Sequence, residues 1–283
     1  MKVLPFIIPK PEQAALVFQE DHELIFYDKF HQHKEIQISL IIEGEGTLIV
    51  GDTINYYKTG DVLVIGSNLP HVFKSDVKKT GQSHMLTLFF TEDAFGKDFF
   101  KLEDLKELDR FFKRAAYGFK VKTHENNLEL LFYRLKDATK LSQFILLFEI
   151  LNVISKQTYE SLSSFIYDKK YNDIEGKRMR DVMEYTMNNF HNEITLENIA
   201  TMAAMTKNAF CKYFKKRTNK TYFTFLNELR IENACKLLQS DKGFTISQIA
   251  DKSGFNSISN FNRQFKAIKH MNPMAFKRDQ SKS

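Results

Sequence analysis

Four side chains in the first part of the chain have the types and spacing to bind a metal ion or a small molecule. His31, His33 and Gln37 fall on one face of a predicted strand, because successive side chains of a strand point to opposite faces. A third imidazole, His71, follows further along the chain. Three imidazoles can bind a divalent transition metal, but an amide such as Gln37 is a weak ligand. We therefore expect these four residues to line a pocket for a small effector, and we expect no metal there.

Catalysis has no positive signal in this sequence. No stretch resembles a nucleophile with its base or a glycine-rich loop that binds phosphate. The two cysteines, Cys211 and Cys235, are too few for a disulfide framework or a cysteine-rich metal site. We expect no enzyme activity and no cofactor.

A second group of residues, near the C-terminus, could read DNA. The last hundred residues contain one helical pattern twice, about fifty-one residues apart. The first copy has Ile199, Ala200, Met205, Phe210, Phe214, Lys215 and Phe225, and the second has Ile249, Ala250, Phe255, Phe261, Phe265, Lys266 and Phe276. Two copies are too few for a solenoid, which needs three or more repeats to bury a continuous core. The pattern predicts a duplicated helix-turn-helix.

Each copy has what a helix-turn-helix needs: a small residue where its helices cross and apolar residues that fix the second helix. Ala200 and Ala250 are the small residues. Gly254 permits the turn in the second copy, whereas the first copy has Ala204 there. Phenylalanine pairs four residues apart are often only core. Two spaced copies in the one strongly basic part of the chain favour DNA binding instead.

The positions that face outward are the candidate base-reading residues. They are Lys207, Asn208, Cys211 and Lys212 in the first predicted recognition helix, and Ser257, Ile258, Ser259, Asn260 and Arg263 in the second. Asparagine and arginine pair with adenine and guanine edges, and isoleucine can contact a thymine methyl group. The residues expected to contact phosphates, which fix register without reading sequence, are Thr206, Lys215, Lys216, Lys266 and Lys269.

The charge is divided unevenly along the chain. From residue 176 onward there are 19 Lys and Arg against 9 Asp and Glu, a net charge of +10. The first 175 residues carry a net charge of −4. A basic C-terminal third indicates a polyanionic partner for that third alone, and double-stranded DNA is the expected partner.

Residues 246–278 carry a recognisable signature. They run from Ile246-Ser-Gln-Ile-Ala-Asp-Lys-Ser-Gly-Phe255 through Phe261-Asn-Arg-Gln-Phe-Lys266 to Asn272-Pro-Met-Ala-Phe276-Lys-Arg278, and they resemble the signature of AraC-type transcription regulators. The resemblance covers roughly 177–280. It implies a seven-helix domain with two helix-turn-helix motifs that recruits or positions RNA polymerase, most often as an activator. Its base-contact positions fall on Asn208, Cys211, Lys212, Ile258, Ser259, Asn260 and Arg263.

Three positions depart from that family. It usually has glycine after each recognition helix, where this chain has Asn219 and His270. Asparagine tolerates the left-handed backbone conformation and histidine tolerates it less well, so we expect the second helix to end differently. Cys211 is an unusual base reader, which moves the expected contacts toward Lys212.

The first domain, residues 1–100, is expected to be all-β. Short apolar runs separated by glycine-containing turns predict a small barrel or sandwich. The stretches around His31 and His71 resemble the two cupin motifs, whose metal-binding members have a glutamate where this chain has Gln37. The resemblance implies a cupin-like sensor barrel with a pocket for an effector.

Two segments join the predicted barrel to the DNA-binding domain. Residues 101–160 show helical periodicity, and the helix at 141–154 is apolar almost all round. Such a helix packs against the barrel, its partner helix or a second subunit, and we expect this segment to form a homodimer. Residues 161–176 predict a linker into the domain at 177–283, whose helices are expected at 177–190, 195–203, 206–217, 221–238, 245–252, 257–268 and 273–279.

The chain shows no sign of a membrane or secretory destination. The apolar run at 1–9 is too short and too interrupted by proline for a signal peptide. The longest apolar segment, 144–154, contains Glu149 and Asn152 and cannot span a bilayer. We expect a cytoplasmic protein.

The fold class predicted is multidomain, with an N-terminal all-β cupin-like barrel and following helices, then a C-terminal all-α tandem helix-turn-helix domain. The function predicted is transcription regulation, as an activator that responds to an effector in the barrel. Two alternatives stay open: a metal-dependent cupin enzyme fused to a DNA-binding domain, and a constitutive regulator whose barrel holds no ligand. Metal content would identify the first, and a barrel filled by phenylalanine side chains would support the second.

Overall fold

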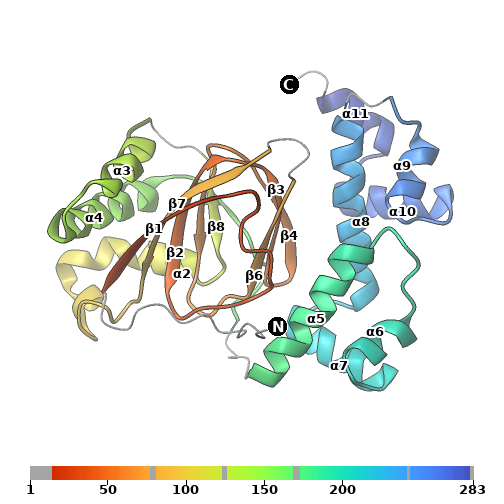
Figure 1. Ribbon diagram of the computed structural model, residues 1–283, viewed down its shortest axis with the longest axis horizontal. Coiled ribbons are helices and arrows are strands. Elements are labelled where there is room, and N and C mark those ends of the chain that lie inside the picture. Colours follow the sequence, from red (N-terminus) through yellow and green to blue (C-terminus); the bar gives the residue numbers. More distant parts are fainter. Residues whose placement is uncertain (1–14, 77–80, 123–125, 168–172, 241–242, 281–283) are drawn as a thin grey trace. The chain divides into compact units, whose positions relative to one another are not determined.

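The computed structural model describes residues 15–76, 81–122, 126–167, 173–240 and 243–280. The chain divides into two compact units, Met1–Lys177 and Arg178–Ser283. Among the described residues, all strands belong to the first unit, and the second unit is helical (Figure 1). The apolar run at 1–9, which we expect not to be a signal peptide, lies outside the described residues.

The first unit is built on two antiparallel sheets. A six-stranded sheet has the order β1 (Leu16–Glu23), β7 (Ser83–Phe90), β2 (Ile36–Glu43), β5 (Val62–Ile65), β8 (Phe119–Val121) and β9 (Tyr159–Ser161). A three-stranded sheet has the order β4 (Thr53–Tyr57), β3 (Gly46–Val50) and β6 (His71–Ser75). Buried residues of both sheets share one core, so the sheets face each other.

Period-two alternation in β2 explains how the larger sheet is buried on both faces. Ile36, Ile38 and Leu40 pack into the core between this sheet and the helices. The alternate positions point between the two sheets, where Ile41 joins the inter-sheet core. Gln37 lies four residues before Ile41 on the same face of β2, and it is also buried. A strand covered on both faces has few exposed positions, which is why β2 is apolar along most of its length.

The expected barrel is a sandwich rather than a closed barrel. Within the described ranges, β3 pairs with β4 on one side and β6 on the other, and no further strand continues that sheet. Hydrogen bonding therefore ends at its edges instead of passing into the larger sheet. The prediction of an antiparallel β domain followed by helices is confirmed, and the closure of the barrel is wrong.

Three helices cover the outer face of the six-stranded sheet: α2 (Asp109–Ala115), α3 (Asn126–Lys136) and α4 (Lys140–Lys156) (Figure 1). Two 3₁₀ helices, Phe99–Lys101 and Glu103–Leu108, precede them. One side of α4 packs on the sheet through a buried set that includes Leu147, Ile150 and Leu151. Its opposite side leaves Leu141 and Ile145 70% and 52% exposed. The sheet and α3 therefore do not cover all of this apolar helix.

The segment expected to be a linker, 161–176, is largely part of the first unit, so that prediction is wrong for its first residues. Ser161 ends β9, which pairs with β8 in the larger sheet. Leu162 is buried in the inter-sheet core, and Ser163 is buried beside it. The burial of the apolar Leu162 and the hydrogen bonds of the next two serines hold this segment on the first unit. The many polar residues of the segment predicted a linker because the sequence does not show these contacts.

Asp52, in the turn between β3 and β4, supplies those hydrogen bonds. Its carboxylate accepts from the Ser163 hydroxyl (3.0 Å), from the Ser164 backbone N–H (3.0 Å) and from the Ser164 hydroxyl (2.6 Å). Asp52 itself is buried. A buried carboxylate is stable only when it is well hydrogen-bonded, so this cluster couples the turn to the chain that leads into the second unit.

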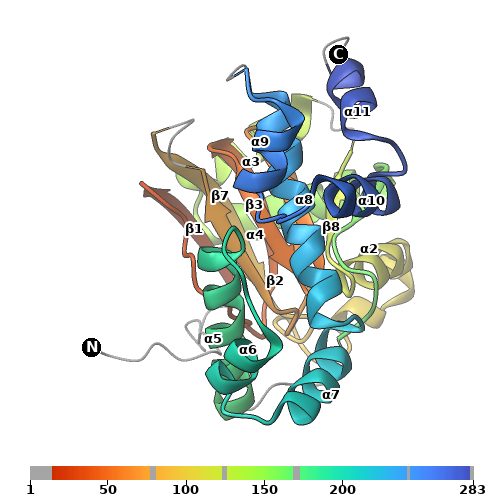
Figure 2. The ribbon, with the colours of Figure 1, turned by 90° about the vertical axis from the view of Figure 1, so that its right-hand side faces the viewer.

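The described residues from 173 onward form all seven expected helices, of which the first begins before the boundary of the second unit. They are α5 (Asp173–Asn189), α6 (Leu196–Met202), α7 (Lys207–Thr218), α8 (Tyr222–Gln239), α9 (Ile246–Lys252), α10 (Ile258–Lys269) and α11 (Pro273–Gln280). Figures 1 and 2 both show α6 and α7 at one end of the long helix α8, and α9 and α10 at its other end. Threonine caps begin α6, α7, α8 and α9, at Thr195, Thr206, Thr221 and Thr245. Within the described ranges, no helix is both long enough and apolar enough to cross a lipid bilayer.

Asp52→Asn tests the anchoring of the segment after β9. We expect the free energy of unfolding of the first unit to fall by roughly 2–3 kcal/mol, because hydrogen bonds to a charged acceptor are replaced by weaker ones and one acceptor is lost. Denaturant unfolding followed by circular dichroism measures the change. The matched control is Asp98→Asn, which removes an exposed carboxylate paired with Lys101 and should change stability by less than about 0.5 kcal/mol. Equal effects of the two changes would contradict the anchoring.

Candidate DNA-binding surface and histidine cluster

The first recognition helix, α7, is held by aromatic side chains on one face. Phe210 and Phe214 are fully buried. Their rings lie 5.5 and 5.3 Å from the ring of Tyr222, and Phe214 lies 5.8 Å from Phe225. Tyr222 and Phe225 belong to the first turns of α8. Because this face of α7 is fixed to α8, the opposite face must point to solvent.

The outward face of α7 carries the residues expected from the sequence. Lys207, Asn208, Cys211 and Lys212 are all exposed. Thr206 caps the helix, its hydroxyl oxygen accepting from the Ala209 backbone N–H (3.3 Å). The remaining N–H groups of the first turn stay available to an anion such as a phosphate.

The second recognition helix, α10, is also held by aromatic side chains on one face, which contact a different set of rings. Phe261 lies 5.3 Å from Phe255 and 5.7 Å from Phe265, and Phe265 lies 5.7 Å from Phe276 of α11. These buried rings pack with the second half of α8. Ser257 caps the helix by accepting from the Asn260 backbone N–H at 3.5 Å.

The outward face of α10 carries an apolar side chain, Ile258, and polar side chains, including Arg263. Ile258 is 46% exposed at the first position of the helix, and Ser257 and Ser259 on either side are exposed. Arg263 is exposed and donates from Nη2 to the Asn260 side-chain oxygen at 2.9 Å. This bond restrains the Arg263 and Asn260 side chains relative to each other.

The candidate phosphate contacts do not all have the same surroundings. Lys215, Lys216 and Lys266 are exposed. Lys269 is paired with Glu232 of α8. Burial disfavours its charged form, but Glu232, Cys235 and Glu228 together outweigh burial and raise the pKa of Lys269. The structure therefore points to Lys269 as a brace between α10 and α8 rather than as a phosphate contact.

Arg230 is a structural residue that the sequence did not reveal. From α8, its Nε donates to the Phe190 carbonyl oxygen (2.7 Å) and its Nη2 to that of Asn192 (2.8 Å). Its guanidinium also lies 5.7 Å from the centre of the Phe255 ring. Arg230 thus joins the end of α5 to the second motif. The sequence feature that could have indicated this structural role was a charged residue among the apolar positions of α8.

The two turns differ in the residue that takes the left-handed conformation. Gly254 has φ +85°, and a Cβ atom there would lie 2.4 Å from the Phe190 carbonyl oxygen. Ala204 occupies the left-handed region with φ 51°, which is unfavourable for an alanine. After the recognition helices, Asn219 (φ 55°) and His270 (φ 58°) are both left-handed caps. The expectation that the second helix ends differently is wrong, because His270 adopts the same cap as Asn219.

His31, His33 and His71 of the first unit come together from two segments. The backbone N–H groups of His31 and His71 each donate to the other residue's carbonyl oxygen, at 3.0 and 2.8 Å. Ring centroids are 4.3 Å apart for His31 and His71, and 5.0 Å apart for His33 and His71. One ligand atom from each ring lies within 4.8 Å of those from the other two. All three residues are buried, so the structure places the expected histidines in one interior cluster.

Backbone carbonyl groups select the tautomer of each ring. The Nδ1 atoms of His31, His33 and His71 lie 2.7, 2.8 and 2.9 Å from the carbonyl oxygens of Lys29, Glu35 and Leu69, respectively. A carbonyl oxygen only accepts, so Nδ1 must carry a proton in all three rings. In the neutral state the lone pairs of His31 and His71 are then on Nε2. His33 differs, because its Nε2 also faces an acceptor, the Gln37 amide oxygen.

Gln37 extends the cluster into the inter-sheet space. The oxygen of its amide lies 3.1 Å from His33 Nε2. The nitrogen of the amide donates to the Ser39 hydroxyl at 2.9 Å, and that hydroxyl lies 2.8 Å from the Thr87 hydroxyl. All of these residues are buried. The fourth residue expected from the sequence is therefore next to the three histidines, in a chain of buried polar groups.

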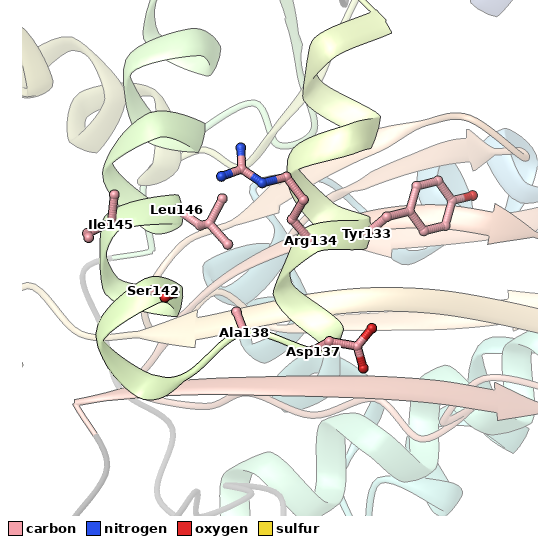
Figure 3. Close-up of a pocket in the computed structure, with 7 residues that line it drawn as sticks. All are labelled: Tyr133, Arg134, Asp137, Ala138, Ser142, Ile145 and Leu146. Atoms are coloured by element: carbon pink, nitrogen blue, oxygen red, sulfur yellow. The ribbon is translucent and has the colours of Figure 1, made fainter.

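A separate groove of about 540 Å³ lies between α3 and α4. Figure 3 shows Tyr133 and Arg134 on α3, Asp137 just after that helix, and Ile145 with Leu146 on α4 around it. Its lining includes one positively charged side chain, Arg134, and one negatively charged side chain, Asp137, beside exposed apolar side chains. The sequence predicted the apolar helix, but only the packing of α3 on α4 shows which of its residues remain exposed.

Comparison with known proteins agrees with these features. Residues 199–279 match the helix-turn-helix domain family. The uncharacterized HTH-type transcriptional regulator YdeC of Bacillus subtilis is 24% identical over 257 residues, which cover 89% of this chain and 87% of that protein. An uncharacterized HTH-type transcriptional regulator of Staphylococcus aureus is 25% identical over 256 residues, but this chain covers only 32% of its length. A solved structure of a DNA-binding transcriptional dual regulator from Escherichia coli K-12 aligns with 41% of this chain and 100% of that one, at 23% identity and a TM-score of 0.35.

Ala204→Gly and Gly254→Ala should change stability in opposite directions. Ala204→Gly relieves a left-handed alanine and should raise the free energy of unfolding of the helical unit by about 0.5–1 kcal/mol. Gly254→Ala places a Cβ against the Phe190 carbonyl and should lower it by more than about 2 kcal/mol. Denaturant unfolding measures both.

The control for Ala204→Gly is Ala267→Gly. Ala267 is exposed within α10, where glycine should lower the free energy of unfolding by about 1 kcal/mol. Destabilisation by both alanine-to-glycine changes would contradict the strain at Ala204.

Proposed function

We propose that this chain is an AraC-type helix-turn-helix regulator that recognises a specific DNA sequence with both motifs and regulates transcription in response to an effector bound in its first unit. The observation that carries this proposal is the pair of recognition helices with buried aromatic inner faces and exposed polar outer faces. The relatives are named as transcription regulators, which supports a regulatory rather than an enzymatic function.

The base-reading residues proposed are those that the packing leaves outside. On α7 they are Asn208, Cys211 and Lys212, with Lys207 at the helix start, and on α10 they are Ser257, Ile258, Ser259, Asn260 and Arg263. Arg263 with Asn260 is suited to a guanine or adenine edge, and Ile258 to a thymine methyl group. Thr206, Lys215, Lys216 and Lys266 would contact phosphates and set the register.

Both motifs are fixed to one helix, which favours simultaneous binding. The first half of α8 packs on α7 and its second half packs on α9 and α10. Two recognition helices held in this way suit successive major grooves on one face of DNA, about 34 Å apart. The net charge of +10 from residue 176 onward supplies the general attraction to phosphate.

We place the effector site in the cupin-like sandwich, at His31, His33, Gln37 and His71. These residues are polar, buried and adjacent, which is the arrangement expected of a specific interior site. The His71 strand is linked to the turn that holds Asp52, because the Gly51 N–H donates to the Pro70 carbonyl oxygen at 2.8 Å. Binding at the histidines can therefore alter the Asp52 contacts of residues 163 and 164.

The remaining parts of the proposal concern the setting in which the regulator works. DNA as partner implies action in the cytoplasm of a bacterial-type cell. Activation through contact with RNA polymerase is the expected mode, on the resemblance to AraC-type regulators. Transcription from a template carrying the selected site, with and without the purified chain, distinguishes activation from repression.

Arg263→Ala and Lys266→Ala separate base reading from phosphate binding. The operator is first selected from genomic fragments with the purified chain. Arg263→Ala should lower affinity for it by about 5- to 150-fold, because a bidentate contact supplies about 1–3 kcal/mol of discrimination. Lys266→Ala should weaken binding to operator and random DNA alike, and should lower the slope of log affinity against log salt by about 1. Fluorescence titration at several salt concentrations measures both effects.

Lys101→Ala is the control, because Lys101 is an exposed lysine of the first unit and should leave both quantities unchanged. If Arg263→Ala weakened operator and random DNA equally, Arg263 would be a phosphate contact and not a reader.

We also propose that the groove between α3 and α4 binds the same groove of a second copy. Ile145 and Tyr133 give the groove exposed apolar side chains, and Leu141 of α4 and Leu130 of α3 are also exposed on the same two helices. Arg134 and Asp137 both line it, so a two-fold axis can bring the cation of one copy to the anion of the other. This charge pattern favours a second copy over an unrelated partner.

Ile145→Glu should convert the dimer to a monomer, because it buries a carboxylate at the centre of the proposed interface. Light scattering after size exclusion measures the mass of the full chain. Leu24→Glu, at a residue that is 70% exposed away from the groove, is the control and should stay dimeric. A monomeric parent chain, or a dimer that survives Ile145→Glu, would contradict this interface.

A further inference from the structure

We propose that Glu232 of α8 is a specificity-determining residue, which acts through an ion pair with Lys269 rather than through a contact with a base. The pair keeps Lys269 away from DNA phosphates and fixes the end of the second recognition helix on α8. This inference rests on the proposed DNA-binding function. It adds a residue that favours the operator over random DNA.

Lys269 occupies a position from which a free lysine would contribute to DNA binding. It is the last residue of α10 and follows Lys266 by three positions. Residues three apart are neighbours on the surface of a helix. Lys266 is exposed, and Arg263, three positions earlier, is exposed as well. Lys269 therefore lies within one helical turn of a proposed phosphate contact.

The fold gives Lys269 an anionic partner of its own. Its Nζ donates to a carboxylate oxygen of Glu232, and the two side chains are only 24% and 25% exposed. Partly buried pairs are screened less by salt than exposed ones. The contrast is Lys207, whose pair with Glu197 spans 3.4 Å between side chains that are 54% and 74% exposed. Such an exposed pair is weak, so Lys207 is available to a phosphate and Lys269 is held.

The neighbouring acidic residue of α8 already has a lysine partner. Glu228 precedes Glu232 by four positions, so both carboxylates lie on one side of the helix. Glu228 accepts from the Lys220 Nζ at 2.8 Å, and both of these side chains are half-buried. Lys220 comes directly after Asn219, the cap of the first recognition helix. Removal of the Glu232 charge therefore leaves Lys269 beside a carboxylate that is already paired.

The pair affects binding to random DNA and to the operator differently. Random DNA is bound almost entirely through its phosphates, so a released lysine raises the affinity for it. The operator complex also needs the base-reading side chains at fixed positions, and the pair joins the end of α10 to α8. Without the pair, the operator complex gains the same phosphate contact but loses part of the positioning of Arg263. The ratio of operator to random affinity therefore falls.

Glu232→Gln in the full chain tests this inference, with the selected operator and a random duplex of equal length. We expect the affinity for the random duplex to rise about three- to eightfold near 0.1 M salt, because one added phosphate contact steepens the salt dependence by about 0.9. The operator affinity should rise less or fall, so that the ratio drops by about threefold or more. Fluorescence titration at several salt concentrations measures both duplexes.

Two control variants separate the released lysine from the change in net charge. Asp251→Asn removes an exposed carboxylate of α9 that does not hold Lys269, and it should leave the salt dependence unchanged. Glu232→Gln combined with Lys269→Gln has no lysine to release. This double variant should therefore return the random-duplex affinity and its salt dependence to the values of the parent chain.

Lys269→Gln alone provides an independent measurement if Glu232→Gln does not fold, which circular dichroism would show. Because the pair already withholds Lys269 from phosphate, this change should leave the salt dependence for random DNA unchanged, unlike Lys266→Ala. A fall in the salt dependence by about 1 would identify Lys269 as a phosphate contact and overturn the inference.

Three further outcomes would contradict the inference. They are an unchanged random-duplex affinity with Glu232→Gln, an equal rise with Asp251→Asn, and a rise that persists in the double variant. A loss of operator affinity alone would show that the pair only braces the helix. A parent chain that selects no operator would instead count against the proposed function, and the measurements on random DNA would still decide whether Glu232 withholds Lys269.

Discussion

The packing of aromatic side chains on the long helix α8 is the constraint on which the DNA-reading surface depends. Phe214 meets Phe225 on the first half of that helix, and Phe261 packs with its second half. Because one helix carries both contacts, the two recognition helices cannot turn independently. Arg230 adds a polar connection from the same helix. Whatever faces outward on α7 and α10 does so because these inner faces are fixed.

The first unit depends on a different constraint, the burial of one sheet on both faces. Covering one face with helices requires apolar residues such as Ile38, and those residues form a continuous core. The other face is enclosed by a second sheet, and there Gln37 and Ser39 introduce polar groups that must find partners inside the protein. The result is a small polar region within an apolar sandwich, next to the three histidines. Such a region has few structural uses and is suited to holding a ligand.

Asp52 connects the sandwich to the segment of chain that leads into the helical unit. Its turn is hydrogen-bonded to the residue before the His71 strand, and its carboxylate accepts hydrogen bonds from Ser163 and Ser164. These serines precede the helix α5, which begins the helical unit.

The sequence by itself determined the helical unit almost completely. Its periodic phenylalanines, small crossing residues and threonine caps are local signals, and each motif needs only neighbours within about fifty residues. It also identified the four polar residues of the histidine cluster, although the single strand predicted for His31, His33 and Gln37 is wrong: Gln37 lies in β2, and the two histidines precede that strand. The tertiary structure decided what depends on distant partners. Whether Lys269 is available to DNA depends on Glu232, thirty-seven positions earlier, and whether residues near Ser163 form a linker depends on Asp52. The same holds for the histidines, since only the fold brings a backbone carbonyl group to each Nδ1 and gathers the three rings in the interior.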